Sequence, residues 1–395
     1  MSRDFDLVVF GATGFTGKLV ADYISRTTPQ PRWAIAGRNR DKLQALGLSV
    51  PVLVADALDP AAVADIARRT KVICTTAGPY AKYGNEIVAA CAAHGTHYCD
   101  LAGEVQWMRR MIDAHHERAV TSGARIVHTC GFDSIPSDLG TWALQQEMIA
   151  AFGVPARKIT ALFGESSGAL SGGTVASGMQ TAFEASRDRA VRAVLGNPYA
   201  LDPDPYASRP PAPDERSIGW CAPLKMFTVP FLMAGINTRV VRRGHALSGF
   251  PWGEDFVYRE VMSTPGSPRG LAMATAIVGG LAGVAFAMKR PRLRDLLAKR
   301  APQPGEGPSE KQRTQGHWKT RFIGEAGNHR LMYVAGDAHG DPGYASTAKM
   351  LGESALCLAA DPLTAPGGVT TPSVAMGAFL LDRLRRAGLT FEVAG

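Results

Sequence analysis

The chain has 395 residues, of which 46% are hydrophobic and 20% charged. This composition excludes a disordered protein, and the length favours two domains over a single core. The formal net charge is +8, but residues 289–330 alone hold 11 basic and 4 acidic residues. Because the positive charge is concentrated in one segment and not spread along a groove or a helix, no nucleic-acid partner is expected.

The six cysteines contain no CxxC pair, and most lie in or beside apolar runs, which predicts free, buried thiols. The N-terminal residues lead directly into a strand and show no features of a secretory signal. We therefore expect a cytoplasmic location.

The first 135 residues alternate short apolar runs with helical patterns. The expected strands are 5–10, 33–36, 50–54, 72–76, 96–101 and 124–130, and the expected helices are 14–25, 40–46, 60–69, 85–94 and 105–122. This alternation predicts an α/β fold, a Rossmann-type doubly wound parallel sheet, over residues 1–135.

The pattern changes after Pro136. Expected strands at 159–163, 225–227 and 318–334, the last with a turn at Gly327-Asn328, predict an inserted central α+β domain over residues 136–340. Proline-rich stretches at 198–213 and 302–308 predict loops. Helices at 346–359 and 373–386, within 341–395, are expected to return to the first domain.

A glycine-rich turn follows the first strand directly and opens the first helix. Glycines let the chain turn tightly and let a pyrophosphate approach bare backbone at a helix N-terminus, where free N–H groups bind it. The residues expected to bind a dinucleotide here are Gly11, Ala12, Thr13, Gly14, Phe15, Thr16 and Gly17.

The residue that selects the cofactor is expected just past the second strand. NAD enzymes present an acidic residue there, but this chain has Arg38, whose guanidinium can pair with a 2′-phosphate. The cofactor is therefore predicted to be NADP(H). Asp56, after the third strand, either accepts from the adenine amino group or simply forms a turn.

Later strand ends are expected to line the same crevice. Thr76, Ala77, Gly78 and Pro79 are predicted to lie along the middle of the cofactor. Tyr80 could reach the nicotinamide side. Asp133 and Ser134 either face the crevice or cap the next helix, and capping is favoured for Ser134.

The chain resembles the saccharopine dehydrogenase-like oxidoreductases, and among them the trans-acting enoyl reductases of mycobacterial type. The resemblance covers the whole length. It rests on GATGFTGKLV at 11–20, AGRN at 36–39, TTAGPYAKYG at 75–84, CAAHGTHYCDLAGE at 91–104, GFDSIPSDLG at 131–140, SGGT at 171–174 and DPGYASTAKM at 341–350.

This resemblance implies hydride transfer from NADPH to the β-carbon of an α,β-unsaturated acyl chain, supplied in trans by a polyketide synthase or acyl carrier in lipid biosynthesis. Tyr80 and Asp133 are the first catalytic candidates, followed by Lys349, with Ser171 and Thr174 as substrate-binding candidates. The small, neutral segment SSGALSGGTVASGM suits an apolar acyl chain better than the charged substrate saccharopine. The alternatives are a non-catalytic, lipid-associated scaffold protein that binds the nucleotide, and a reductase of a C=N or C=O group.

No metal site is expected. Cys91, His94, His97 and Cys99 crowd together, but a helix end, a turn and the next strand are unlikely to direct four ligands to one point.

Residues 271–288 contain no charge and are followed by a basic segment, 289–300. For a transmembrane helix the segment is short and diluted by alanine and glycine, so a buried or interfacial helix fits better. The neighbouring cations predict docking of 271–300 on an anionic membrane surface, at the inner face of the plasma membrane, or on an acidic acyl carrier. The sequence leaves open whether the protein forms a homodimer.

Overall fold

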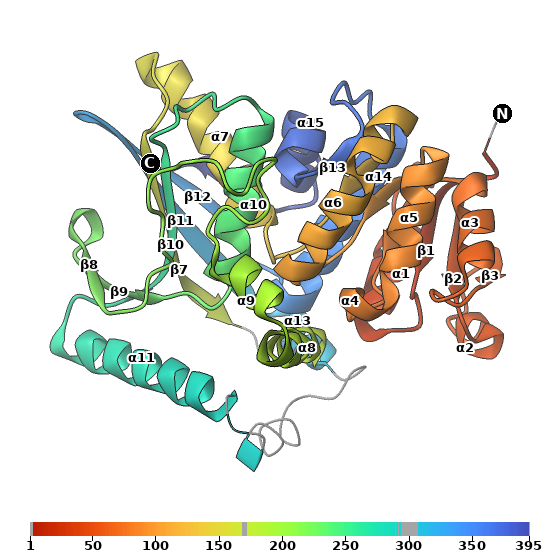
Figure 1. Cartoon of the computed structure of the whole chain (residues 1–395), viewed down its shortest axis with the longest axis horizontal. Coiled ribbons are helices and arrows are strands. Elements are labelled where there is room, and N and C mark those ends of the chain that lie inside the picture. Colours follow the sequence, from red (N-terminus) through yellow and green to blue (C-terminus); the bar gives the residue numbers. More distant parts are fainter. Residues whose placement is uncertain (1–2, 168–171, 289, 291, 294–306, 395) are drawn as a thin grey trace.

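The computed structural model describes residues 3–394, apart from 168–171, 289, 291 and 294–306; for residue 165 and residues 172–176 it describes the backbone alone. The described residues form two seven-stranded sheets with helices packed around them (Figure 1). We call them sheet A and sheet B. The predicted α/β class, with a second sheet in the middle of the chain, is confirmed.

Sheet A is parallel throughout and is the predicted doubly wound sheet. Its strands, in order across the sheet, are β13 (Gly368–Thr370), β6 (Arg125–Val127), β5 (His97–Cys99), β4 (Thr70–Thr75), β1 (Phe5–Phe10), β2 (Trp33–Gly37) and β3 (Val52–Val54). The central strands are covered on both faces, which explains why they occur in the sequence as continuous apolar runs.

Helices cover both faces of sheet A. They are α3 (Pro60–Arg69), α5 (Asn85–His94) and α6 (Val105–Ser122) on one face, α1 (Phe15–Ser25) and α14 (Thr347–Ala360) on the other, and the short α2 (Arg40–Gln44) after β2. Local signals fix their ends. Asp59 accepts from the N–H groups at the start of α3, and Gly95 and Gly123 end α5 and α6 with φ of 65° and 77°.

Sheet B is mixed. Its strands, in order, are β14 (Thr390–Val393), β12 (His329–Asp337), β11 (His317–Ala326), β7 (Lys158–Ser167), β10 (Val257–Thr264), β9 (Met226–Pro230) and β8 (Gly219–Cys221). The predicted hairpin is confirmed, with Ala326 opposite His329. Strand β10 was not predicted, because charged residues interrupt its apolar pattern although Glu260 is buried.

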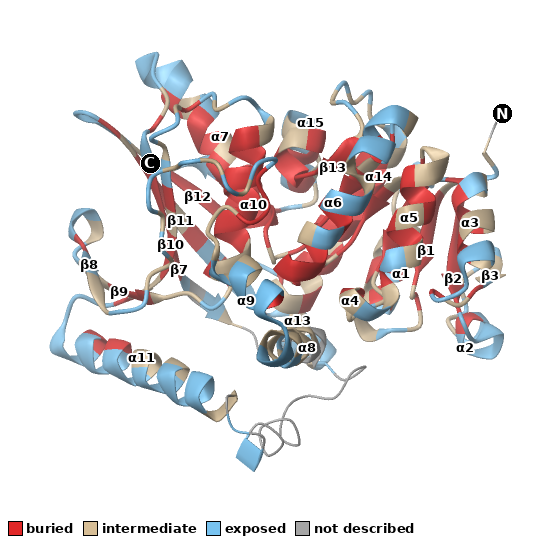
Figure 2. Cartoon of the chain, viewed as in Figure 1, coloured by how far each residue is buried: buried red, intermediate tan, exposed pale blue. Residues whose placement is uncertain are grey.

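One helix joins the two sheets. Helix α7 (Ile135–Phe152) follows β6 and packs on β11 and β12. It also contacts α10 (Ala234–Leu247) and α15 (Pro372–Arg386). A continuous core runs from Leu7 of β1 through Leu139 of α7 to Phe322 of β11 (Figure 2). The remaining helices are α4 (Tyr80–Tyr83), α8 (Gly172–Arg187), α9 (Arg189–Gly196), α13 (Glu310–Thr314), the 3₁₀ turn η1 (Ala222–Leu224) and the π-helix η2 (Pro342–Ser346).

The last 55 residues serve both sheets. Helix α14 packs on sheet A and β13 extends that sheet, in keeping with the expected return to the first domain. Helix α15, however, lies on α7, and β14 pairs with β12 of sheet B. The expectation of helices alone missed β13 and β14, because strands of three and four residues are too short to show a periodic pattern.

Helix α11 (Pro268–Met288) differs from every helix above because it is apolar but largely exposed (Figure 2). Within it, Gly270 and Ala274 are buried. Among the described residues it is the one helix long and apolar enough to cross a membrane, by length and composition. Of the two predicted forms, a buried helix is therefore wrong, and an interfacial helix stays a prediction.

Candidate functional site

A groove lies at the carboxyl edge of sheet A, where β1, β2, β3 and β4 end. Its lining residues are Phe10, Gly11, Thr13, Gly14, Gly37, Arg38, Asp56, Ala57, Thr76, Ala77, Gly78 and Tyr83. Ligands of doubly wound sheets bind in this position, outside the carboxyl ends of the strands. Most of the residues predicted to bind the cofactor thus share one groove.

The glycine turn presents backbone, and not side chains, to this groove. Gly11 has a φ of 83°, a conformation that favours glycine. A Cβ on Gly17 would lie 2.3 Å from the carbonyl oxygen of Gly11, so α1 can pack against the turn only with glycine there. A Cβ on Gly14 would meet nothing closer than that same oxygen, at 3.4 Å. The space beside Gly14 is therefore open to a ligand.

The first turn of α1 offers free donors to the groove. No described side chain caps the helix at Gly14, so its first N–H groups and the positive end of its dipole remain for an anion. Ala12 is buried behind the turn, and Phe15 packs edge-on against Tyr344 with ring centroids 4.8 Å apart. Residues 12 and 15–17 are thus placed to act through their backbone, and a pyrophosphate fits this cradle.

Arg38 and Asp56 stand at the far end of the groove. The exposed guanidinium of Arg38 lies 5.9 Å from the ring centroid of Tyr83. Asp56 accepts from the N–H of Leu58 at 3.0 Å, so it forms the turn that was one of its two interpretations, while also lining the groove. Tyr83 was not predicted; its position four residues beyond Pro79 in the conspicuous TTAGPYAKYG segment is the signal that could have identified it.

Tyr80 lies below the groove and not in it. Pro79 precedes it at the start of α4. The Tyr80 hydroxyl donates to the carbonyl of Thr75 at 3.2 Å and accepts from the N–H of Leu101 at 3.1 Å. Burial, followed by the negative charges of Asp100 and Asp133, raises its pKa far above the ordinary value. A phenol so buried and bonded joins two strand ends, and we assign it a positioning role.

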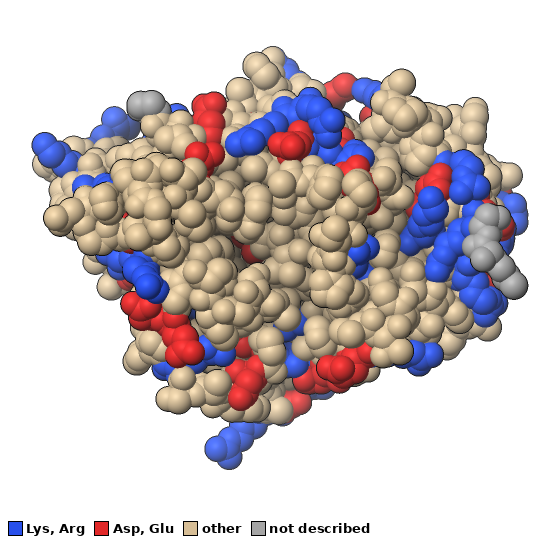
Figure 3. Space-filling view, turned by 90° about the horizontal axis from the view of Figure 1, so that it is seen from above, with Lys and Arg blue, Asp and Glu red and all other residues tan. Residues whose placement is uncertain are grey.

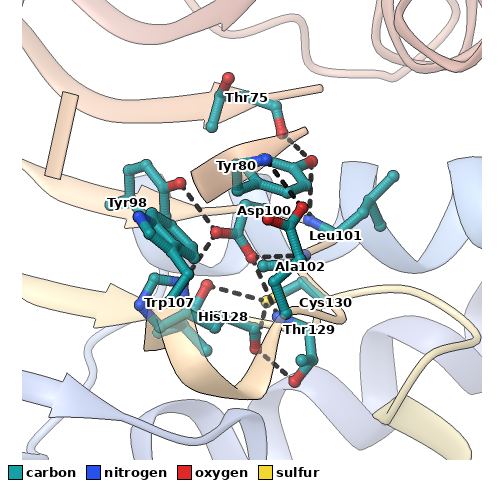
Figure 4. Close-up of polar contacts among 12 residues, drawn as sticks. Thr75, Tyr80, Tyr98, Asp100, Leu101, Ala102, Trp107, His128, Thr129 and Cys130 are labelled. Atoms are coloured by element: carbon teal, nitrogen blue, oxygen red, sulfur yellow. Dashed lines mark hydrogen bonds and ion pairs between the residues drawn. The ribbon is translucent and has the colours of Figure 1, made fainter. Parts of the chain in front are cut away.

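Asp100 is the centre of a buried polar network at the end of β5 (Figure 4). One carboxylate oxygen accepts from the hydroxyl of Tyr98 at 2.7 Å and lies 2.7 Å from Nδ1 of His128. The other accepts from the N–H groups of Ala102 at 2.9 Å and Thr129 at 3.0 Å. Each oxygen of this buried carboxylate therefore has two polar partners.

Thr129, one of the residues bonded to Asp100, has an unfavourable backbone conformation. Its φ is 61°, an unfavourable conformation for a β-branched residue, and it is this conformation that brings its N–H to Asp100. Sequence reasoning missed Asp100 and His128. Their signal was weak. Each is a polar residue directly after a buried strand, at the edge of the sheet where functional side chains are expected.

Asp133 lies in the loop after β6, half-buried at the same edge. Burial, and secondly the charge of Asp100, raises its pKa to about 7. Asp133 also raises the pKa of Tyr80, which begins α4 two residues after the groove residue Gly78. The charge of Asp133 thus acts on Tyr80, and of the two catalytic candidates Asp133 is the one whose pKa lies near neutral pH.

Ser134 does not cap α7. Its hydroxyl donates instead to the side-chain oxygen of Asn237 at 2.9 Å, so the favoured capping interpretation is wrong. The reason is tertiary: α10 packs on the start of α7 and supplies a buried partner that the local sequence does not show.

The other predicted residues do not converge on Asp133 by any described contact. Lys349 forms an ion pair with Asp337 at 2.8 Å, which accounts for its charge without a catalytic role. Ser171 lies outside the described residues, and Thr174 is described only as part of the backbone of α8. In the described part of the chain, no three His, Cys, Asp or Glu side chains are grouped as metal ligands.

An aromatic cluster adjoins Asp133 on the side of sheet B. Phe132 packs edge-on against Trp318 at 5.0 Å and Phe163 at 6.2 Å, and Phe163 stacks on Phe231 at 4.2 Å. Phe132 and Phe231 remain partly exposed. The face of sheet B nearest Asp133 is therefore apolar.

Comparison with known proteins identifies the class. Residues 7–127 match the family described as the saccharopine dehydrogenase NADP binding domain. Saccharopine dehydrogenase (L-Glu forming) of Saccharomyces cerevisiae shares the fold: it is 13% identical, with a TM-score of 0.55 over 98% of this chain and 99% of that one. The groove and the matched domain define an NADP-dependent oxidoreductase that binds NADP(H), as predicted.

Full-length relatives identify the family more closely. A Mycobacterium tuberculosis protein is 41% identical over 412 residues, which cover 99% of this chain and 97% of its own. Trans-acting enoyl reductases of Mycobacterium ulcerans and Mycobacterium leprae are 39% and 38% identical, over 98% of this chain and 97% of each relative. The chain belongs to the trans-acting enoyl reductase family, and the predicted resemblance is confirmed.

Proposed function

We propose that this protein uses NADPH to reduce the C=C bond of an α,β-unsaturated acyl thioester, with Asp133 as the proton donor. Membership of the trans-acting enoyl reductase family supports the reaction type. The observation that carries the proposal is a half-buried carboxyl with a pKa of about 7 in the loop after β6, at the carboxyl edge of the sheet that also carries the groove. A carboxyl with such a pKa can donate a proton near neutral pH, which supports its assignment as the general acid.

When bound, NADPH supplies the hydride. The chain's own residues hold the pyrophosphate against the turn at Gly14 and leave Arg38 to pair with the 2′-phosphate. Asp133 delivers a proton to the α-carbon as the thioester accepts negative charge. Burial, and secondly the charge of Asp100, raises the pKa of Asp133 so that it can carry this proton near pH 7. Tyr80 fixes the spacing between the strand ends.

The surroundings of Asp133 favour an apolar acyl substrate over a polycarboxylate. Phe132 and Phe231 present apolar surface beside the buried Phe163 and Trp318, and the charge of Lys349 is engaged by its ion pair with Asp337. A substrate such as saccharopine would need several unpaired cations there. An alkyl chain needs only the apolar face.

Partners and location follow from the same chemistry. We propose that a polyketide synthase or acyl carrier presents the thioester in trans, in the cytoplasm, during lipid biosynthesis. The relation to the membrane depends on helix α11, described below.

Stopped-flow oxidation of NADPH by a medium-chain 2-enoyl thioester tests the reaction. We expect oxidation with formation of the saturated thioester, deuterium from 4-deuterated NADPH on the β-carbon, and solvent deuterium on the α-carbon. Tight NADPH binding without any oxidation would favour the non-catalytic scaffold. Oxidation only with keto or imino substrates would favour the reductase of C=O or C=N groups.

A further inference from the structure

Helix α11 is attached to the molecule at its beginning only. The Thr264 hydroxyl donates to the carbonyl of Gly270 at 2.9 Å, and Gly270 and Ala274 are buried against the β9–β10 region. Beyond Ala274 the helix contains no buried residue, and Val284 and Phe286 are 52% and 55% exposed. A long apolar surface is therefore left without a partner in the described part of the chain.

The exposed apolar side chains point to more than one side of the helix. At 100° per residue, Leu271 and Phe286 lie on one side, whereas Met273 and Val284 lie on another. A groove on a protein partner covers one stripe of a helix and leaves a polar face to water. Residues 270–288 carry no charge at all. Hydrocarbon, which can surround a helix on several sides, matches this pattern better than a protein groove.

The helix is long enough to cross a bilayer, since 21 residues span about 31 Å. The chain that follows forbids crossing. It must return to α13, where the guanidinium of Arg313 lies 5.4 Å from the ring of Phe15 at the start of α1. The connecting residues 289–309 include six basic residues, which would be costly to carry through hydrocarbon. The helix must therefore lie along a surface.

Charge at the helix ends selects the kind of surface. Arg269, Arg290 and Arg292 are exposed, and the sequence from 261 to 294 contains no acidic residue. The Arg290 guanidinium lies 3.6 Å from the ring centroid of Phe286, so a cation and an exposed apolar ring occupy the same level. The face seen in Figure 3 differs, because acidic and basic side chains lie next to one another there.

The helix and the catalytic edge lie at the same end of the molecule. Helices α8, α11 and α13 share that end (Figure 1). Ser177 of α8 donates to Glu104 at 2.9 Å, and Glu104 accepts from the N–H of Tyr80, so α8 sits over the start of α4. A surface in contact with α11 would therefore face the carboxyl edge of sheet A.

We propose that α11 lies in the plane of an anionic lipid bilayer and is sunk into the hydrocarbon boundary, so that lipid contacts it on more than one side, at Val284 as well as at Phe286, with Arg290 and Arg292 at the lipid phosphates. This attachment holds the catalytic edge toward the bilayer, so that a long acyl chain can reach the site without leaving an apolar environment. The benefit to the acyl chain rests on the proposed function, but the attachment itself can be tested apart from it, because enoyl reduction can be assayed with soluble thioesters.

Co-sedimentation of the full chain with vesicles tests this attachment. We expect binding to phosphatidylcholine vesicles that contain phosphatidylglycerol, and weak binding to phosphatidylcholine alone. The double variant Val284→Ser/Phe286→Ser should weaken binding by about tenfold or more. Arg290→Gln/Arg292→Gln should weaken it by about fivefold per arginine, and added salt should mimic that loss.

The matched control is Phe379→Ser, since Phe379 is 41% exposed on α15, away from α11. It should bind vesicles like the wild type, and all variants should keep their NADPH affinity. Absence of vesicle binding, or equal binding by the Val284→Ser/Phe286→Ser variant, would overturn the proposal. So would sedimentation-velocity data that show a dimer dissociated by that variant, because a second copy would then cover the helix.

Discussion

The two ends of the catalytic edge of sheet A are built in different ways. The cofactor end consists of a short run of consecutive residues, Gly11 to Gly17, completed by Arg38, and it presents open backbone to the groove. The Asp133 end brings together residues from the ends of β5 and β6, and its carboxyls are buried or half-buried. The cofactor end leaves backbone N–H groups open to a ligand. At the Asp133 end, burial and the charge of one carboxyl raise the pKa of another. Variants at the cofactor end should change the affinity for NADPH, and variants at the Asp133 end should change kcat.

The largest expected effect is that of Asp133→Asn, which should affect kcat but not the affinity for NADPH. Loss of a proton donor should lower kcat by about 10²- to 10⁴-fold, while the Kd of NADPH stays within about twofold because the groove is untouched. Stopped-flow turnover and fluorescence titration measure the two quantities. Asp188→Asn is the control, since Asp188 is an exposed helix cap that asparagine can replace. Wild-type kcat in Asp133→Asn would assign the proton to another group.

The opposite result is expected for Arg38→Ala. Removal of a charge-assisted contact to the 2′-phosphate should raise the Kd of NADPH by about 10- to 100-fold and leave that of NADH unchanged. At saturating NADPH, kcat should remain that of the wild type. Equal losses for both nucleotides would contradict the 2′-phosphate contact.

The same difference explains what the sequence could predict. The glycine turn and Arg38 were predictable because they are consecutive or fall at a fixed place after a strand, and local backbone geometry determines their positions. The strands and helices of sheet A were predictable for the same reason. Asp133 was found only as a loop residue near the crevice, and its pKa of about 7 depends on its burial and secondly on Asp100, 33 residues earlier in the chain.

Burial created by distant segments was not predictable. Ser134 has the local pattern of a helix cap, but its partner comes from α10. Both α11 and α14 contain apolar runs in the sequence, but α14 packs between sheet A and α15, whereas α11 has no described partner beyond its first turns. Periodicity predicts a helix and its apolar character, but the presence of a partner decides whether it is buried.

The pH dependence of the rate distinguishes the two ends further. A general acid must be protonated, so kcat/KM should be level below the pKa of about 7 and fall by about tenfold per pH unit above it. The measurement is kcat/KM from pH 5 to 9, where the pH values bracket that pKa on both sides. This alkaline limb, the decrease of kcat/KM above the pKa, should persist in Arg38→Ala, which does not touch Asp133. It should disappear from the residual activity of Asp133→Asn. A limb that survives in Asp133→Asn would belong to a different group.

The smallest effect, and the sharpest test of the comparison, is expected for Asp100→Asn. The negative charge of Asp100 helps to raise the pKa of Asp133, so its removal should move the alkaline limb to lower pH and reduce the rate at pH 7 more than at pH 5. Some loss of stability is expected, about 1–3 kcal/mol, because the network around Asp100 loses acceptors, and thermal unfolding will report it. Asp138→Asn is the matched control: Asp138 is also a buried carboxyl, bonded to Ser373, and its charge is not among those that act on Asp133. A shifted limb in Asp100→Asn alone, with unchanged NADPH affinity, would show that the buried end sets the proton chemistry independently of the open end. An unshifted limb with weakened NADPH binding would mean that the two ends form one unit.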